Sequence, residues 1–177
     1  DNPTTPERVE LGRLLFFDPV LSNGDDIACA TCHHPDLGFS DGRATSVMPG
    51  GDTPARNALT LWNVVYDQSL FWDGRVNSLE EQALAPLTHA DEMAVADPET
   101  MLADLRAIPE YVQRFEAAFG VAAEGITVDH VTQALAAFQR TLISDDSPFD
   151  RYAAGDREVR ADLTVQNGGP VQPDAEF

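Results

Sequence analysis

The sequence contains no lysine, so its 11 positive charges are all arginine, set against 30 acidic residues. The resulting formal net charge of −19 predicts a surface that repels nucleic acid and anionic lipid. No apolar run is long enough to span a membrane, and two cysteines are too few for a disulfide scaffold. These absences exclude a nucleic-acid binder, a membrane-spanning chain and a cystine-rich fold. The acidic surface suits a cationic partner, a salty medium or simple solvation.

Length and composition predict one domain followed by a tail. A chain of 177 residues with 43% hydrophobic side chains is enough for one sizeable core. The segment 18–57 lacks periodicity and contains both cysteines, which is typical of a functional loop. We expect residues 1–155 to form the domain and residues 156–177 to form a linker or a disordered tail.

Helix signals dominate the sequence. Alternating strand patterns are nearly absent, which favours an all-α fold. Capping residues, prolines and apolar spacing predict helices that start near residues 6, 79, 98, 109 and 127. The helix at Leu79 is expected to end near Leu84, and Gly120 is expected to end the helix that starts at Pro109.

The sequence CATCH at residues 29–33 has the C-x-x-C-H spacing of c-type haem attachment. One tight turn directs the Cys29 and Cys32 thiols toward the two vinyl groups of a porphyrin, and His33 brings an imidazole under the iron. A redox dithiol, half of a zinc site and a plain disulfide are the alternatives. Zinc needs two further ligands at suitable spacing and a thioredoxin-like dithiol needs a βαβ context, and neither pattern is present. We therefore predict one covalently bound haem c.

Covalent haem also accounts for the rest of the composition. A small helical chain with a long irregular loop gains part of its core from a large apolar disc, and a bound cofactor stabilises the folded state. Thioether formation takes place outside the reducing cytosol, so the motif indicates a periplasmic location.

Beyond this motif, the sequence resembles a known family over nearly all of residues 6–155. It is similar to the N-terminal, peroxidatic haem domain of the bacterial dihaem cytochrome c peroxidase and MauG family. The stretches that carry the resemblance are LGRLLFFDP at 11–19, CATCH at 29–33, LGFSDG at 37–42, RN at 56–57, FWDGR at 71–75 and SPFD at 147–150. The resemblance implies a cytochrome c-like fold of short helices around one haem.

The resemblance also assigns roles to particular positions. His33 would be the proximal iron ligand, and Gln82 and Glu92 match the family's distal glutamine and glutamate. Trp72 matches the tryptophan that relays electrons between the two haems, and Asn57 matches a side chain associated with calcium. These residue types suit the chemistry, because a desolvated carboxylate can move a proton and an amide can donate a hydrogen bond without titrating.

Four further positions bear on the haem environment. The family often places a removable histidine on the distal side, and that position aligns with Pro49 here, which leaves the iron open. Met48 could instead bind as a sixth ligand and favour electron transfer. Arg56 and Arg75 are candidates to pair with the haem propionates, or else they offset nearby acids.

The function implied is a haem c peroxidase domain that reduces hydrogen peroxide at an open ferric haem. Its electrons would come from a second haem domain, a partner cytochrome or a cupredoxin. One alternative is MauG-like oxidation of an aromatic residue on a partner protein, and another is a monohaem electron-transfer cytochrome. The family carries a second C-x-x-C-H motif in a C-terminal domain, and residues 34–177 contain no further cysteine.

Overall fold

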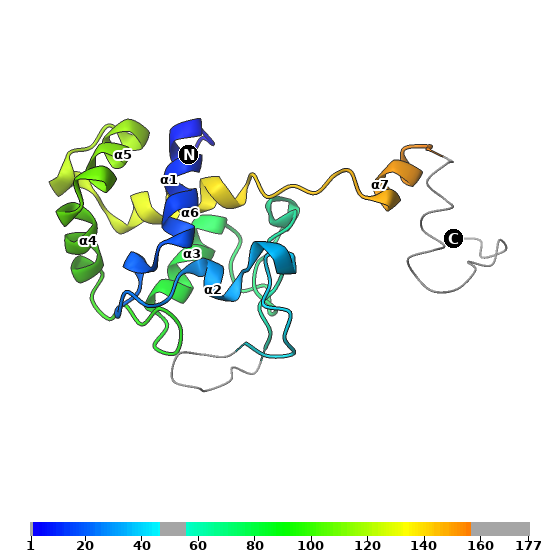
Figure 1. Ribbon diagram of the computed structural model, residues 1–177, viewed down its shortest axis with the longest axis horizontal. Helices are drawn as coiled ribbons and strands as arrows, with labels where there is room; N and C mark the ends of the chain where they lie inside the picture. Colours follow the sequence, from blue (N-terminus) through cyan, green and yellow to red (C-terminus); the bar gives the residue numbers. More distant parts are fainter. Residues whose placement is uncertain (1, 47–55, 157–177) are drawn as a thin grey trace. The chain divides into compact units, whose positions relative to one another are not determined.

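A computed structural model describes residues 2–46 and 56–156 of the chain. Contacts divide the chain into two units, residues 1–142 and residues 143–177, which are considered separately. The described residues form α-helices and short 3₁₀-helices joined by long loops, with isolated bridges as their only β pairing (Figure 1). The all-α class expected from the sequence is confirmed.

The helices begin close to the positions that the sequence predicts. In the first unit they are α1 (Pro6–Phe17), α2 (Cys29–Cys32), α3 (Leu79–Thr88), α4 (Pro98–Ala107), α5 (Pro109–Phe119) and α6 (Val128–Gln139). The 3₁₀-helices are η1 (Pro19–Leu21), η2 (Pro35–Leu37), η3 (Val64–Tyr66) and η4 (Ala123–Gly125). The second unit contains α7 (Pro148–Ala153), whose first turn is capped by Ser147. None of the described helices is both long and apolar enough to cross a membrane.

Side-chain caps explain most of these helix starts. Thr5 accepts a hydrogen bond from the backbone of Arg8, and Ser78 accepts one from the backbone of Glu81. At α6 the cap is reciprocal, because Thr127 accepts from the His130 backbone while the His130 ring accepts from the Thr127 backbone. His130 therefore has a structural role at the start of α6.

The helix α3 is longer than the sequence predicts. The expected end near Leu84 was wrong, because the helix continues through Pro86 to Thr88. Proline inside a helix removes one backbone donor, but Leu87 beyond it is only 2% exposed. Burial of this side chain in the core offsets the lost hydrogen bond. At the other predicted end, Gly120 closes α5 in a left-handed conformation, as expected.

The core of the first unit is centred on the crossing of α1 and α6 (Figure 1). Gly12 lies at the crossing, where an added Cβ would come within 1.9 Å of the Ala134 carbonyl oxygen. The side chains that fill this interface are fully or almost fully buried: Leu11, Leu15, Phe16, Val131, Leu135 and Phe138. Because Gly12 has no side chain, the backbones of α1 and α6 come into contact, and the surrounding side chains pack tightly.

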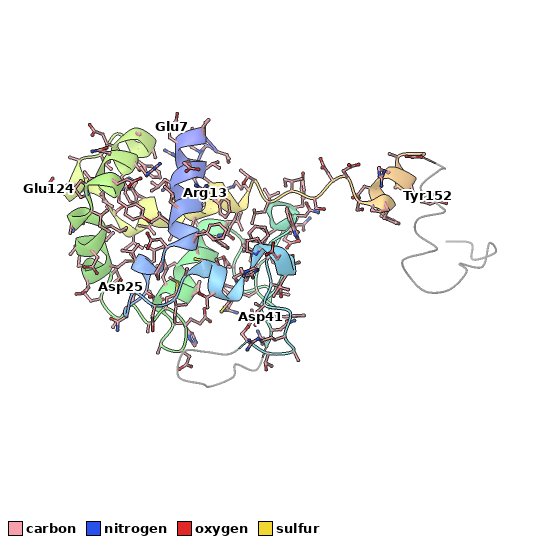
Figure 2. All side chains as sticks on the ribbon, in the orientation of Figure 1. Glu7, Arg13, Asp25, Asp41, Glu124 and Tyr152 are labelled. Carbon is pink, nitrogen blue, oxygen red and sulfur yellow. The ribbon has the colours of Figure 1, made fainter. Side chains whose placement is uncertain are left out.

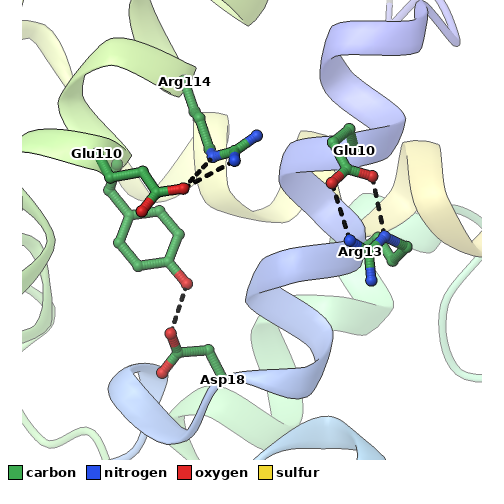
Figure 3. Close-up of polar contacts among 6 residues, drawn as sticks. Glu10, Arg13, Asp18, Glu110 and Arg114 are labelled. Carbon is green, nitrogen blue, oxygen red and sulfur yellow. Dashed lines mark hydrogen bonds and ion pairs between the residues drawn. The ribbon is translucent and has the colours of Figure 1, made fainter.

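A hydrogen bond connects α5 to the end of α1. The Tyr111 hydroxyl donates to Asp18 at 2.7 Å (Figure 3). Asp18 also caps η1 by accepting from the Val20 backbone at 2.9 Å. Burial, followed by this contact with Asp18, raises the pKa of Tyr111. One carboxylate therefore fixes both the turn after α1 and the position of α5.

The acidic surface is dispersed. Glu7, Asp25, Asp41 and Glu124 project from widely separated parts of the first unit (Figure 2). Several other surface acids are paired locally, as Glu10 is with Arg13 at 2.8 Å (Figure 3). The four labelled acids therefore do not gather into one patch.

Candidate functional site

The two cysteines lie on α2, a single turn within the irregular segment. The Thr31 hydroxyl accepts from the Ala28 backbone at 3.1 Å, and the His33 backbone donates to the Cys29 carbonyl at 3.0 Å. Both ends of the turn are thereby fixed. The two thiols are not joined in a disulfide. The plain disulfide, one of the alternatives for this motif, is thus not what the structure contains.

His33 is held by a backbone carbonyl. Its Nδ1 lies 2.9 Å from the Phe39 carbonyl oxygen, and because a carbonyl can only accept, Nδ1 carries the proton. Nε2 is then the nitrogen that can bind a metal. Burial lowers the pKa of His33, although hydrogen bonds with the backbones of Phe39 and Leu59 oppose this shift. The imidazole is therefore oriented and kept neutral, as a metal ligand requires.

The electrostatics of the thiols argue against a redox dithiol. Burial raises the pKa of Cys29 to about 12. Burial also raises the pKa of Cys32, and the nearby carboxylates of Asp41 and Glu92 add to the effect. Reactive dithiols instead have a lowered pKa and an electropositive surrounding. The described residues also contain no group of three or more His, Cys, Asp or Glu placed to hold a metal ion, so the zinc alternative gains no support.

Glu92 lies in a tight loop that follows α3. The His89 carbonyl accepts from the backbones of both Glu92 and Ala94 at 3.0 Å, and Ala94 has a φ of +56°. Burial raises the pKa of Glu92, while the charges of His89 and Arg75 oppose the shift. Its charge is one of the contributions that raise the pKa of the Cys32 thiol. Glu92 is thus half-buried and partly desolvated, unlike an ordinary loop carboxylate.

Gln82 is half-buried on α3, directly before the buried Ala83. Pro86 lies four residues further on and has no N–H to donate to the Gln82 carbonyl. The backbone is therefore perturbed at the turn that carries this side chain.

Trp72 is exposed, with 57% of its surface accessible. Its indole nitrogen donates to the Asn57 backbone carbonyl at 3.1 Å. The alternative of a buried core aromatic is therefore wrong for Trp72. Asn57 itself is half-buried, and the prediction that its side chain associates with calcium stays a prediction.

The two candidate propionate-binding arginines share one carboxylate. Asp73 lies 3.1 Å from Arg56 and 2.9 Å from Arg75. Arg75 also lies over the ring of Phe71, at 3.4 Å from its centroid. Pairing with a nearby acid, the second interpretation given for these arginines, is what the structure contains. Propionate binding stays a prediction. The predicted positions Met48 and Pro49 lie outside the described residues.

Several contacts around His33 carry no signal in the sequence. Phe39 adopts a φ of +53°, and its ring packs edge-on against Trp62 with centroids 5.2 Å apart. The Thr60 hydroxyl donates to the Gly38 carbonyl. Only the placement of residues 37–42 just after the motif hinted that this loop supports the imidazole.

Most of this chain is similar to part of several longer, known proteins. A family profile described as di-haem cytochrome c peroxidase matches residues 6–158. The methylamine utilization protein MauG of Methylorubrum extorquens is 47% identical over 158 residues, which cover 89% of this chain and 44% of that protein. The cytochrome c551 peroxidase of Pseudomonas aeruginosa is 40% identical over 154 residues, which cover 87% of this chain and 44% of that protein.

Solved structures of similar proteins have a similar fold. A MauG-like protein associated with microbial copper homeostasis aligns with a TM-score of 0.80 and 32% identity, over 98% of this chain and 47% of that one. The diheme peroxidase BthA from Burkholderia thailandensis aligns with a TM-score of 0.73 and 25% identity, over 98% of this chain and 45% of that one. The chain thus spans less than half the length of these relatives.

Proposed function

Because the chain belongs to the di-haem cytochrome c peroxidase and MauG family, we propose that it forms the haem domain in which hydrogen peroxide is reduced. We assign this role to residues 1–155. The resemblance expected from the sequence is confirmed at the level of the family. The observation that carries the proposal is the arrangement at α2, where two free thiols on one turn precede an imidazole whose Nδ1 lies 2.9 Å from the Phe39 carbonyl oxygen.

The donor set fits one covalently attached haem c. The Phe39 carbonyl occupies Nδ1 of His33 and thereby presents Nε2 as the ligand atom. Cys29 and Cys32 on one helical turn supply two thiols for thioether bonds. The matching motif in the relatives belongs to di-haem proteins, and this chain would hold one of the two groups.

When bound, the haem iron supplies the redox chemistry that cleaves the O–O bond. The chain's own residues then manage protons and hydrogen bonds. Glu92 in its ionised form takes the proton from the inner peroxide oxygen and returns it to the outer one, which leaves as water. Gln82 would donate a hydrogen bond to the peroxide without changing its own protonation. Overall, one peroxide consumes two electrons and two protons and yields two water molecules.

The two electrons must come from outside this domain. Trp72 is our candidate relay, because an indole is readily oxidised and this one is exposed, with its nitrogen fixed by the Asn57 carbonyl. A second haem domain, a partner cytochrome or a cupredoxin would donate them. Covalent haem attachment, which takes place outside the reducing cytosol, supports a periplasmic location.

A second candidate function is oxidation of an aromatic residue on a partner protein. MauG of Methylorubrum extorquens is more similar to this chain, at 47% identity, than the Pseudomonas aeruginosa peroxidase, at 40%. The exposed Trp72 would then carry electrons inward from the partner's aromatic residue instead of from a dedicated electron donor.

The ferric absorption spectrum tests the open site. A high-spin charge-transfer band is expected if water or nothing occupies the distal position. A low-spin spectrum with a sulfur-to-iron band would instead identify Met48 as the sixth ligand and a monohaem electron-transfer cytochrome as the function.

Stopped-flow reaction of the ferric protein with peroxide tests Glu92. Glu92→Gln should slow the reaction by ~10²-fold or more, and its rate should lack the rise with pH that we expect for the wild type. Because burial raises the pKa of Glu92, the wild-type rise should lie above the ordinary glutamate range. Glu116→Gln, at an exposed position on α5, is the matched control and should leave the rate within about threefold. Equal rates for the wild type and Glu92→Gln would remove Glu92 from this role.

A further inference from the structure

The carbonyl that holds His33 belongs to a residue in an unfavourable backbone conformation. Phe39 has a φ of +53°, in the left-handed region that bulky side chains rarely adopt. The loop partly closes on itself, because the His34 backbone donates to the Ser40 carbonyl and the Phe39 backbone donates to the His34 carbonyl, both at 2.9 Å. Such a conformation persists only where surrounding contacts enforce it.

The Phe16 ring packs against Phe39 from α1, with centroids 6.1 Å apart, and further contacts come from residues 58–62, about 20 positions later in the sequence. Every second residue of this segment touches one of three consecutive residues in the loop. The three contacts are the Ser40 hydroxyl donating to the Ala58 carbonyl at 2.7 Å, the Thr60 hydroxyl donating to the Gly38 carbonyl, and the Trp62 ring packing edge-on against Phe39 at an interplanar angle of 88°. The residues before, at and after the critical carbonyl are therefore each held.

The Thr60 hydroxyl is fixed in its donor direction. Its oxygen accepts from the Trp62 backbone at 3.2 Å, so its proton is directed to the Gly38 carbonyl. Thr60 is exposed and Trp62 is 39% exposed, so neither is a major part of the core. Their contacts are better suited to setting the geometry of residues 38–40 than to stabilising the fold.

We propose that residues 58–62 clamp the loop that orients His33, with Thr60 and Trp62 as positioning residues for the iron ligand. The inference rests on the proposed function, because it takes His33 as the proximal ligand. A hydrogen bond from Nδ1 to a carbonyl makes the imidazole a stronger donor and favours ferric over ferrous iron. By holding the Phe39 carbonyl 2.9 Å from Nδ1, the clamp keeps the reduction potential low and the oxidising reaction with peroxide favourable.

The test compares Thr60→Val with the wild-type holoprotein. Valine keeps the shape of threonine and removes the hydroxyl. Resonance Raman spectroscopy of the ferrous high-spin protein should show the iron–histidine stretch at lower frequency in Thr60→Val, and redox titration should give a higher midpoint potential. Thr60→Ser restores the hydroxyl and should return both values to those of the wild type.

A matched control separates the clamp from a general effect of losing a hydroxyl. Thr141 is also exposed and also donates to a backbone carbonyl, that of Phe138 at 2.7 Å. Thr141→Val should leave the stretch and the potential unchanged. Trp62→Leu removes the edge-on contact with Phe39 and should shift both values in the same direction as Thr60→Val, which keeps the test valid if Thr60→Val does not fold.

Failure of the clamp and failure of the proposed function give different results. Haem-loaded Thr60→Val and Trp62→Leu with wild-type stretch and potential would overturn the clamp and leave the function standing. A wild-type protein with a permanent sixth protein ligand would overturn the open peroxidase site, and the potentials of the two variants would then still decide whether the clamp exists.

Discussion

Replacing Gly12 by alanine sets two opposite effects against each other. Alanine is the better helix former, by about 1 kcal/mol in a helix interior. At this position, however, the added Cβ would lie 1.9 Å from the Ala134 carbonyl oxygen and 3.0 Å from the Cβ of Phe138. The first neighbour is backbone and cannot rotate away, so α1 and α6 must separate.

The size of that separation decides whether Gly12→Ala stabilises or destabilises the folded protein. Ordinary contact begins near 3.4 Å, so the two backbones must move apart by about 1.5 Å. A gap of ~0.5–1 Å already removes a quarter to a half of each dispersion contact, and the interface carries fully buried side chains such as Leu11 and Leu15. Because the clash is with backbone, we expect an overpacking cost of about 3–4 kcal/mol, above the usual range of about 1–3 kcal/mol. After the helix-propensity gain, we expect Gly12→Ala to lose about 2–3 kcal/mol of unfolding free energy.

The assay is thermal unfolding of the holoprotein followed by far-ultraviolet circular dichroism. A loss of this size should lower the Tm by about 5–10 °C in a chain of this length. Gly24→Ala is the control, because Gly24 has no positive φ and its nearest neighbour is the flexible side chain of Asp26, at 3.1 Å. It should change the Tm by no more than about 2 °C. An unchanged or raised Tm in Gly12→Ala would show that the helices separate without cost and would refute the reasoning.

Three further substitutions test individual contacts by urea unfolding. Glu80→Gln breaks the 2.7 Å ion pair with Arg140 and should cost about 1–3 kcal/mol at neutral pH. Burial opposes ionisation of Glu80, but hydrogen bonds from Asn2 and Arg140 outweigh burial and lower the pKa of Glu80. The greater stability of the wild type should therefore shrink as the pH falls below the ordinary glutamate pKa. A stability difference that does not change with pH would contradict this. Tyr111→Phe removes the hydrogen bond to Asp18 and should cost about 1–2 kcal/mol, and an unchanged urea midpoint would mean that water replaces the hydroxyl fully. Glu92→Gln should be at least as stable as the wild type at pH 7, because burial raises the pKa of Glu92 and ionisation of this carboxyl at higher pH destabilises the folded state. The difference in stability should vanish below the ordinary glutamate pKa. A variant less stable than the wild type at pH 8 would contradict this expectation.

Local signals made the helices predictable. Thr5 before Pro6, Ser78 before Leu79 and Gly120 after Phe119 each satisfy backbone groups within a few residues, so the sequence alone marks these boundaries. The end of α3 was not predictable in this way. Its continuation past Pro86 depends on burial of Leu87, which is a tertiary effect.

The site was predictable in its residue types but not in its supports. The spacing of residues 29–33 fixes two thiols and an imidazole on one turn, so attachment chemistry can be inferred directly. The exposure of Trp72 and the bridging of Arg56 and Arg75 by Asp73 could not be inferred, since both depend on how distant loops pack. Charge counting likewise gave the net charge but not its dispersal over the surface.

Attachment of the cofactor and control of its chemistry likewise depend on different parts of the sequence, the first on a local motif and the second on distant contacts. The motif at residues 29–33 is local and works wherever one helical turn forms. The geometry of the Phe39 carbonyl depends on residues 58–62, through contacts worth only about 1 kcal/mol each. With His33 as the proposed iron ligand, substitutions in that segment would change how strongly it donates to iron and leave the attachment motif intact. For this reason the properties of the iron must be sought in the loop contacts around the motif, outside the motif itself.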